Sequence, residues 1–223
     1  SIKPGSLVMV VGPVGSGKSA FASSLINTIQ CVEGQVSVKG RVAYVAQSAW
    51  SMNATLENNV RFGLPMERER YAQVLDVCCL GPDLAILPGG DQTEIGEKGV
   101  NLSGGQKQRV SLARAVYWDA DVVIMDDPLS AVDSHVGQSL FDHCITGELL
   151  KGKTRILMTN ALQYLPQADH IIVLDNGRIS EQGSYDELVS SGLDFAALMV
   201  THEVEKEDQE EEDKKAGAGA EAS

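Results

Sequence analysis

The chain alternates short, nearly continuous apolar runs with longer stretches in which apolar residues recur every three or four positions. The short runs are rich in Val, Ile and Met and have the length of strands buried on both faces. The longer stretches have the spacing of amphipathic helices. This alternation predicts a layered α/β fold with a mostly parallel sheet flanked by helices. The expected strands are 6–11, 121–126 and 171–174, and the expected helices are 20–29, 67–79 and 134–145.

Two further patterns predict antiparallel pairing. Asn176-Gly177 follows the run 171–174 and predicts a tight hairpin turn into a strand at 178–180. Between residues 34 and 47, several β-formers suggest strand pairing near the base of an antiparallel β-subdomain. These residues are Val36, Val38, Val42, Ala43 and Val45.

A glycine-rich loop joins the first expected strand to the first expected helix. Gly12, Gly17, Lys18 and Ser19 occupy the fixed positions of the pattern G-x-x-x-x-G-K-[ST]. Glycines let backbone N–H groups converge on phosphate oxygens, and the following helix N-terminus attracts the same anion. Lys18 adds a point charge for the β- and γ-phosphates, and the Ser19 hydroxyl is placed to bind Mg²⁺. The candidate nucleotide-binding residues are Gly12, Pro13, Val14, Gly15, Ser16, Gly17, Lys18, Ser19 and Ala20.

Two acidic residues stand at the end of the apolar run 121–126. Asp126 ends this expected strand, and Asp127-Pro128 comes directly after it. The carboxyl ends of parallel strands are where α/β sheets bind ligands. Asp126 is therefore the candidate to hold Mg²⁺ through water, beside Ser19 and Lys18. A strand-ending Asp that only caps a turn is the alternative.

The segment Leu102-Ser103-Gly104-Gly105-Gln106 and the helical stretch 107–115 resemble the signature motif of ABC-transporter nucleotide-binding domains. We call residues 102–106 the signature segment and residues 12–19 the phosphate loop. Residues 47–63, 93–99 and 126–133 are similar to the first nucleotide-binding domain of subfamily C, the multidrug-resistance-associated group. The resemblance extends from residue 1 to about residue 198.

This resemblance implies an ABC-type P-loop NTPase core with antiparallel β and helical subdomains, the helical one at about 56–118. It implies that Gln47 senses the γ-phosphate through Mg²⁺ or water, so that Ser19, Gln47 and Asp126 form the metal site. It also implies that two such domains close head to tail over two ATP molecules. Ser103, Gly104, Gly105 and Gln106 would then bind the ATP held by the partner domain. The cofactors are ATP and Mg²⁺.

Two positions depart from the pattern of an active ATPase. Family members commonly carry a glutamate after the Mg²⁺ aspartate, but this chain has Asp127, whose side chain is one methylene shorter. The residue after Thr159 is ordinarily histidine, but here it is Asn160, which can neither carry a charge nor relay a proton near neutral pH. Because about 1 Å of misplacement can cost roughly a hundredfold in rate, we expect tight MgATP binding with slow turnover. Asp127, Asn160 and Gln47 are the candidate catalytic residues.

The resemblance leaves two functions open. One is the energy-coupling domain of an exporter, with a second nucleotide-binding domain and transmembrane domains as partners, at the cytoplasmic face of a membrane. The other is a regulatory ATP-binding module that gates a channel or receptor-type ABC protein without significant hydrolysis. A P-loop kinase is a more distant possibility, but such enzymes have no need of the signature segment.

Charge and composition narrow the picture further. The net charge of −13 over 223 residues argues against general nucleic-acid binding, which needs a basic patch. Residues 1–200 are expected to form one domain, whereas 201–223 read as an acidic disordered tail or linker. No apolar run reaches 18 residues, so a membrane association is expected to depend on other segments. Four scattered cysteines without metal spacing are expected to be reduced thiols.

Overall fold

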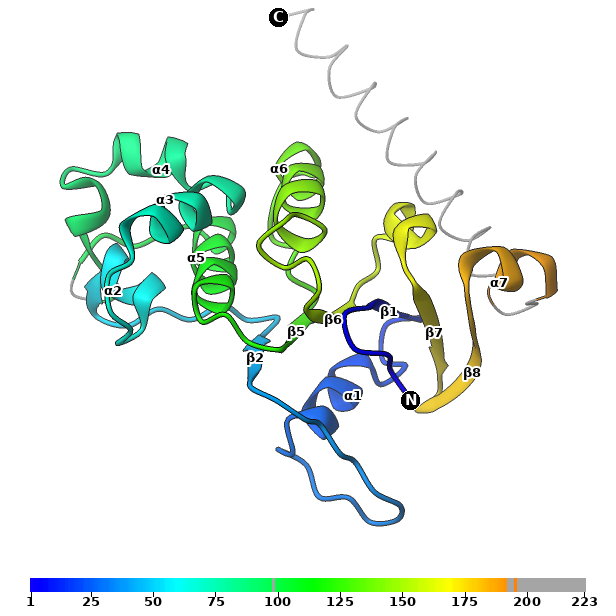
Figure 1. Ribbon diagram of the computed structural model, residues 1–223. Coiled ribbons are helices and arrows are strands. Elements are labelled where there is room, and N and C mark those ends of the chain that lie inside the picture. The colour runs from blue at the N-terminus through cyan, green and yellow to red at the C-terminus, as the bar shows by residue number, and fades with distance from the viewer. Residues whose placement is uncertain (98, 192–194, 196–223) are drawn as a thin grey trace, which may run out of the picture.

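A six-stranded sheet with the order β2-β5-β6-β1-β7-β8 forms the centre of the computed structural model, which describes residues 1–97, 99–191 and 195 (Figure 1). The strands are β1 (Leu7–Val11), β2 (Val42–Val45), β5 (Val122–Asp126), β6 (Thr154–Met158), β7 (His170–Asp175) and β8 (Arg178–Gly183). Four of the pairings are parallel, and β8 pairs antiparallel with β7. The predicted mostly parallel α/β architecture is confirmed.

Helices cover both faces of this sheet. On one face, α1 (Lys18–Leu25) buries Ala22 in a small apolar cluster with Val8 and Val10 of β1. On the other face lie the larger cluster and most of the remaining helices. They include α5 (Gly104–Tyr117), α6 (Ser134–Ser139) with its π-helical continuation η2 (Leu140–Ile145), and the 3₁₀ segment η3 (Leu162–Gln167). Because β1 and β5 are buried on both faces, their sequences are continuously apolar rather than alternating.

A group of short elements lies between β2 and α5, beside the β2 edge of the sheet (Figure 1). The elements are β3 (Ala54–Thr55), α2 (Leu56–Arg61), α3 (Arg68–Val77), α4 (Gly81–Ile86), η1 (Gly90–Gln92) and β4 (Glu94–Ile95). The strands β3 and β4 pair antiparallel. The division of the chain into a helical subdomain at about 56–118, a domain ending at 200 and a linker stays a prediction.

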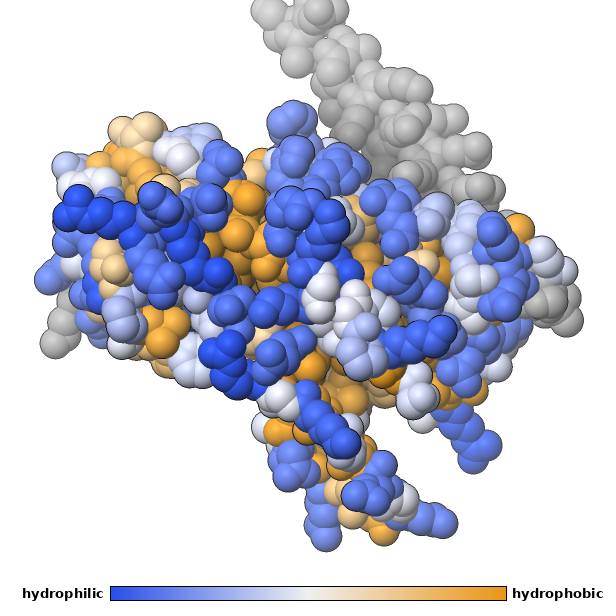
Figure 2. All heavy atoms as spheres, in the orientation of Figure 1, coloured by the Kyte–Doolittle hydropathy of each residue, from blue (hydrophilic) through white to orange (hydrophobic). Residues whose placement is uncertain are grey.

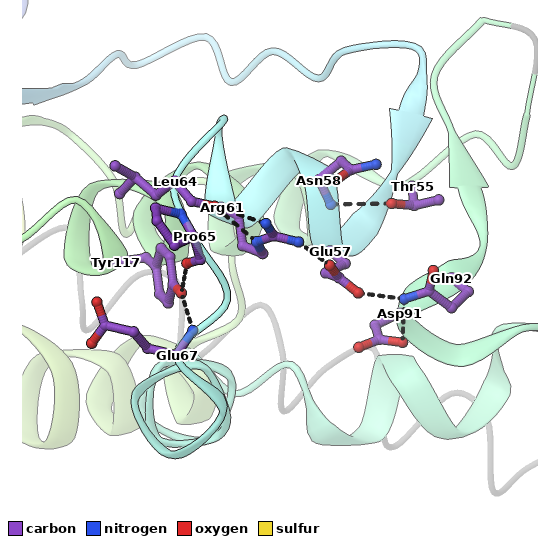
Figure 3. Close-up of polar contacts among 10 residues, drawn as sticks. All are labelled: Thr55, Glu57, Asn58, Arg61, Leu64, Pro65, Glu67, Asp91, Gln92 and Tyr117. Carbon is purple, nitrogen blue, oxygen red and sulfur yellow. Dashed lines mark hydrogen bonds and ion pairs between the residues drawn. The ribbon is translucent and has the colours of Figure 1, made fainter.

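Polar side chains tie this group to α5 (Figure 3). Glu57 pairs with Arg61 one turn later and accepts a 2.5 Å hydrogen bond from Gln92 of η1. The Tyr117 hydroxyl donates to the Pro65 carbonyl over 2.6 Å and accepts from the Glu67 backbone over 2.9 Å. These contacts connect α2, η1 and the start of α3 to the end of α5, so the group has a defined position beside the sheet.

The segment between α1 and β2 differs from the prediction. Only Val42–Val45 forms a strand, and it pairs parallel with β5 in the main sheet. The expected antiparallel pairing at 34–47 is therefore wrong, because residues 34–41 form no strand and β2 pairs only in parallel. Ile29, Val32 and Val36 are instead 46%, 95% and 45% exposed. Figure 2 shows this segment as a lobe below the body with apolar patches on its surface.

Two turn positions explain other boundaries. Helix α1 ends at Leu25, four residues before the predicted end, because Asn27 has a left-handed φ of 58° and Thr28 donates back to Ser23. Asn176 and Gly177 both have positive φ, 46° and 76°, as a tight hairpin turn requires.

None of the helices in the described ranges has the length and apolarity to cross a membrane. The predicted acidic tail lies outside the described residues.

Candidate nucleotide-binding site

The phosphate loop turns sharply between β1 and α1, and glycines make the turn possible. Gly12 has a φ of 149°, and a Cβ there would collide with the Leu174 carbonyl oxygen of β7 and lie 2.8 Å from Ser16 Oγ. Gly17, which precedes α1, has a φ of 105°. Glycine reaches these conformations without the clash that a side chain meets. The loop also packs on the hairpin, since Gly177 N donates to the Ser16 carbonyl over 2.9 Å.

Lys18 and Ser16 place a positive charge and a hydroxyl without a hydrogen-bond partner in this loop. Lys18 Nζ lies over the loop and donates to the carbonyls of Gly12 and Pro13 at 2.6 and 3.0 Å. Partial burial lowers the pKa of Lys18, although Asp127 and Asp126 act in the opposite direction. Ser16 is 4% exposed, and its Oγ has no hydrogen-bond partner. A buried hydroxyl without a partner is costly, so the loop fits a ligand rich in acceptor oxygens.

Asp126 lies at the carboxyl end of β5, as predicted, and is 4% exposed. The Tyr44 hydroxyl of β2 donates to Asp126 Oδ2 over 3.4 Å, and burial followed by the Asp126 charge raises the pKa of Tyr44. The neighbouring strand β6 ends at Met158, opposite Asp126. The next residue, Thr159, donates its backbone N–H to the Val10 carbonyl of β1 over 3.1 Å. The carboxylate therefore reaches the strand edge from which the phosphate loop leaves.

Asp127 has an unusual backbone for a residue other than glycine, with a φ of 50°. Its N–H donates to the Met158 carbonyl over 2.9 Å, which fixes the turn after β5. Burial raises the pKa of the Asp127 carboxyl, Asp126 adds to this, and Ser130, Lys18 and Gln47 counteract it. Asp127 is therefore close enough to Asp126, Lys18 and Gln47 for their groups to act on its carboxyl.

A hollow of about 170 Å³ lies beside Asp127. Asn160, which follows β6, lines the same hollow, together with Thr159, Ser130 and Asp133. Asn160 is exposed and Thr159 is fully buried. The two positions that depart from the pattern of an active ATPase therefore line the same small cavity.

The signature segment lies at the start of α5, apart from the phosphate loop. Ser103 caps this helix: its Oγ accepts from Gln106 N over 3.2 Å, and Gln106 Oε1 accepts from Ser103 N over 2.8 Å. Gly105 packs so closely on the loop after β5 that a Cβ would lie 2.8 Å from the Ala131 carbonyl. Within the described residues, none of the segment's hydrogen bonds goes to the phosphate loop.

The candidate metal-binding residues fit a Mg²⁺ ion whose other ligands are phosphate oxygens and water. No group of three or more His, Cys, Asp and Glu side chains that could hold a metal occurs in ranges 1–97 and 99–191 or at 195. Mg²⁺ is often bound through one or two protein ligands together with substrate phosphates. Ser19 at the start of α1 and Asp126 at the end of β5 provide ligands of this kind.

Sequence reasoning missed two features of the site. Tyr44 was not predicted as a neighbour of Asp126, since a tyrosine in a strand normally indicates core packing. The contact of Gln106 and Arg109 with buried Asp83 was also missed. An acidic residue in an apolar helix such as α4 was the available signal, because a buried carboxylate needs a partner.

Comparison with known proteins defines the class. The sequence profile described as ABC transporter matches residues 1–130. The chain is therefore a nucleotide-binding domain of the ABC transporter class, and it belongs to the ABC transporter family.

The similar proteins narrow this to subfamily C. The chain is 58% identical over 199 residues to ATP-binding cassette sub-family C member 3 of Rattus norvegicus, covering 89% of the chain and 13% of that protein. It is 54% identical over 201 residues to ABC transporter C family member 8 of Dictyostelium discoideum, covering 89% and 13%. It is 52% identical over 201 residues to ATP-binding cassette sub-family C member 2 of Homo sapiens, covering 90% and 13%. The chain thus spans about 13% of the length of these relatives.

Proposed function

We propose that the chain is the ATP-binding domain of an exporter and couples MgATP binding and hydrolysis to transport. The observation that carries the proposal is the phosphate loop before α1, where Lys18 Nζ donates to the Gly12 carbonyl and the buried Ser16 hydroxyl has no hydrogen-bond partner. Lys18 neutralises phosphate charge, and the first N–H groups of α1 have no acceptor within the helix. Ser19, Gln47 and Asp126 hold Mg²⁺, which supplies further charge neutralisation on the phosphates.

The chain's own site turns ATP over slowly. Asp127 aligns water poorly because its carboxylate is one methylene shorter than that of the usual glutamate. Asn160 donates a hydrogen bond to a phosphate oxygen but supplies no positive charge. The closeness of Asp127, Gln47 and Lys18, and the hollow shared by Asp127 and Asn160, support these roles.

The signature segment completes the ATP site of a second nucleotide-binding domain. Ser103 Oγ already accepts a hydrogen bond from Gln106 N, so its O–H group is left to donate. Ser103 and Gly104 are exposed, and the 14-residue helix α5 directs its positive end toward them. These groups suit a phosphate that reaches the segment from another domain.

An exposed aromatic surface offers a contact for the transmembrane domains. Trp50, Phe62 and Trp118 are 47%, 46% and 37% exposed, and they line a hollow of about 220 Å³ with Tyr44 and Arg114. The Arg114 guanidinium lies 4.0 Å from the centre of the Trp50 ring. A surface of this composition resembles the centre of protein interfaces, where Trp, Tyr and Arg are enriched. We assign it to transmembrane domains of the same transporter, at the cytoplasmic face of the membrane.

A regulatory module is the second candidate, and the joint presence of Asp127 and Asn160 favours it. Such a module would bind ATP and close on its partner without significant hydrolysis at either site. Whether the site on the second domain hydrolyses ATP therefore distinguishes a regulator from an exporter.

The test measures MgATP binding and phosphate release by the purified chain, alone and with its second nucleotide-binding domain. We expect one MgATP bound per chain and turnover well below the typical enzyme value of about 10 s⁻¹. Adding the second domain should raise turnover, and Ser103→Ala in this chain should remove that increase. Several turnovers per second from the chain alone would refute the proposal that its own site hydrolyses ATP slowly. No turnover in the pair, with ATP bound to both domains, would support the regulator.

A further inference from the structure

Asp83 is a buried carboxylate in α4 whose partners all lie at the start of α5. Its side chain is 9% exposed. Arg109 approaches both oxygens, with Nη1 2.9 Å from Oδ2 and Nη2 3.0 Å from Oδ1. Gln106 Nε2 also donates to Oδ1 over 2.9 Å. A buried charge is tolerated when it is paired in this way. Asp83 Oδ1 accepts both hydrogen bonds, whereas Oδ2 has only the ion-pair contact with Arg109.

The Gln106 side chain contacts both Asp83 and Ser103. While its Nε2 is held by Asp83, its Oε1 accepts from the Ser103 N–H over 2.8 Å. The Gln106 backbone N–H in turn donates to Ser103 Oγ over 3.2 Å. The chain of contacts therefore begins at a buried charge and ends at an exposed hydroxyl.

Arg109 anchors the same cluster to α3. Its Nη1 donates to the Cys79 carbonyl, just after α3, over 2.7 Å. Asp83 is thus held between the group of short helices and the first two turns of α5.

We infer that Asp83 is a positioning residue that, through Gln106, aims the Ser103 hydroxyl at the terminal phosphate of ATP bound by a second domain. This inference rests on the proposed function of the signature segment. A residue 23 positions before Gln106 would then control the chemistry of a site to which it makes no contact. Removing its charge should weaken that site and leave the phosphate loop of this chain unaffected.

The experiment uses the full-length protein that contains this chain, because the affected site needs the second domain. The variants are Asp83→Asn, Ser103→Ala and the double variant. Asp83→Asn keeps the size of the side chain but sets an amide N–H₂ group against Arg109. Asp76→Asn is the matched control, since Asp76 of α3 is exposed and its carboxylate has no hydrogen bond or ion pair within the described ranges. The readouts are steady-state ATP turnover, MgATP affinity at the phosphate loop of this chain, and the thermal midpoint.

Positioning predicts about a tenfold loss of turnover in Asp83→Asn, with MgATP affinity at the chain's own phosphate loop within twofold of the parent. The double variant should be no slower than Ser103→Ala, because both changes act through one hydroxyl. Turnover within twofold of the parent in Asp83→Asn, or losses that multiply in the double variant, would overturn the inference.

Two results separate this inference from the proposed function and from a folding defect. If Ser103→Ala itself leaves turnover unchanged, the assignment of the signature segment fails. If only Asp83→Asn is silent, the positioning role alone fails. Should Asp83→Asn not fold, Arg109→Lys in the same cycle keeps the charge but removes the hydrogen bond from Arg109 Nη2 to Asp83 Oδ1. It should also cost turnover only while Ser103 is present, and an equal cost in the Ser103→Ala background would overturn positioning.

Discussion

Asp127→Glu should raise turnover and lower stability at the same time. A glutamate extends the carboxylate by one methylene toward the water position, and about 1 Å of misplacement accounts for roughly a hundredfold in rate. Because Asn160 remains, we expect a gain of about 10- to 100-fold. Position 127 has a φ of 50°, which Asp adopts more readily than Glu. The left-handed backbone should cost the variant about 1 kcal/mol, or about 2–4 °C in thermal midpoint.

The assay is phosphate release at saturating MgATP, paired with thermal unfolding of the same preparations. Under the proposed head-to-tail pairing, a high chain concentration would let the signature segment of one copy complete the site of another. Asp119→Glu is the control, since Asp119 also has a left-handed φ of 55° and lies outside the site. It should lose stability without gaining turnover. Unchanged or slower turnover in Asp127→Glu, with MgATP still bound, would refute the reasoning that the short carboxylate limits the rate.

Three further predictions test other parts of the structure. Gly12→Ala should weaken MgATP binding at least tenfold by calorimetry, because the added Cβ collides with the Leu174 carbonyl at a φ of 149°; wild-type affinity would show that the loop adapts. A thiol reagent at pH 8 should modify exposed Cys31 first and spare Cys78 and Cys144, whose sulfurs lie 3.8 Å apart in the core, since burial and then Cys144 raise the pKa of Cys78; mass spectrometry of early fragments checks the order, and rapid loss of Cys78 would contradict the burial. Asp119→Asn should reduce the free energy of unfolding at pH 7 by no more than about 1 kcal/mol, because the carboxylate is half-exposed. Burial raises the pKa of Asp119, but Lys153, Arg70 and Arg41 lower it overall from 3.8. The difference between parent and variant should therefore be full above pH 3.8 and disappear as the pH falls through the lower folded value, and a pH-independent difference in denaturant titrations would contradict the ion pairs.

The strands β1 and β5 could be predicted from the sequence because they are buried on both faces, whereas β6 was not predicted. Such strands must be continuously apolar, and the runs ending at Val11 and Asp126 have this pattern. The segment 34–41 could not be predicted in the same way. Its valines indicate strand propensity, but a strand also needs a neighbour, and the described chain supplies one only for Val42–Val45.

The site was predictable where a motif fixes the local backbone. The phosphate loop and the cap of α5 both depend on residues adjacent in sequence, so spacing alone indicates them. Contacts between distant segments were not predictable from spacing. Tyr44 reaches Asp126 across 82 positions, and Asp83 reaches Arg109 across 26. These contacts depend on tertiary packing, which a local pattern does not contain.

The most direct test of the account measures MgATP binding by the parent chain and by Lys18→Ala. Lys18 Nζ is the charge placed over the phosphate loop, and a hydrogen bond to a charged group is worth about 1.5–3 kcal/mol. The account predicts that Lys18→Ala weakens MgATP binding by about 10- to 150-fold. The control Lys3→Ala, which removes an exposed lysine outside the loop, should bind as the parent does. Equal affinity of Lys18→Ala and the parent chain would contradict the claim that this loop holds the nucleotide.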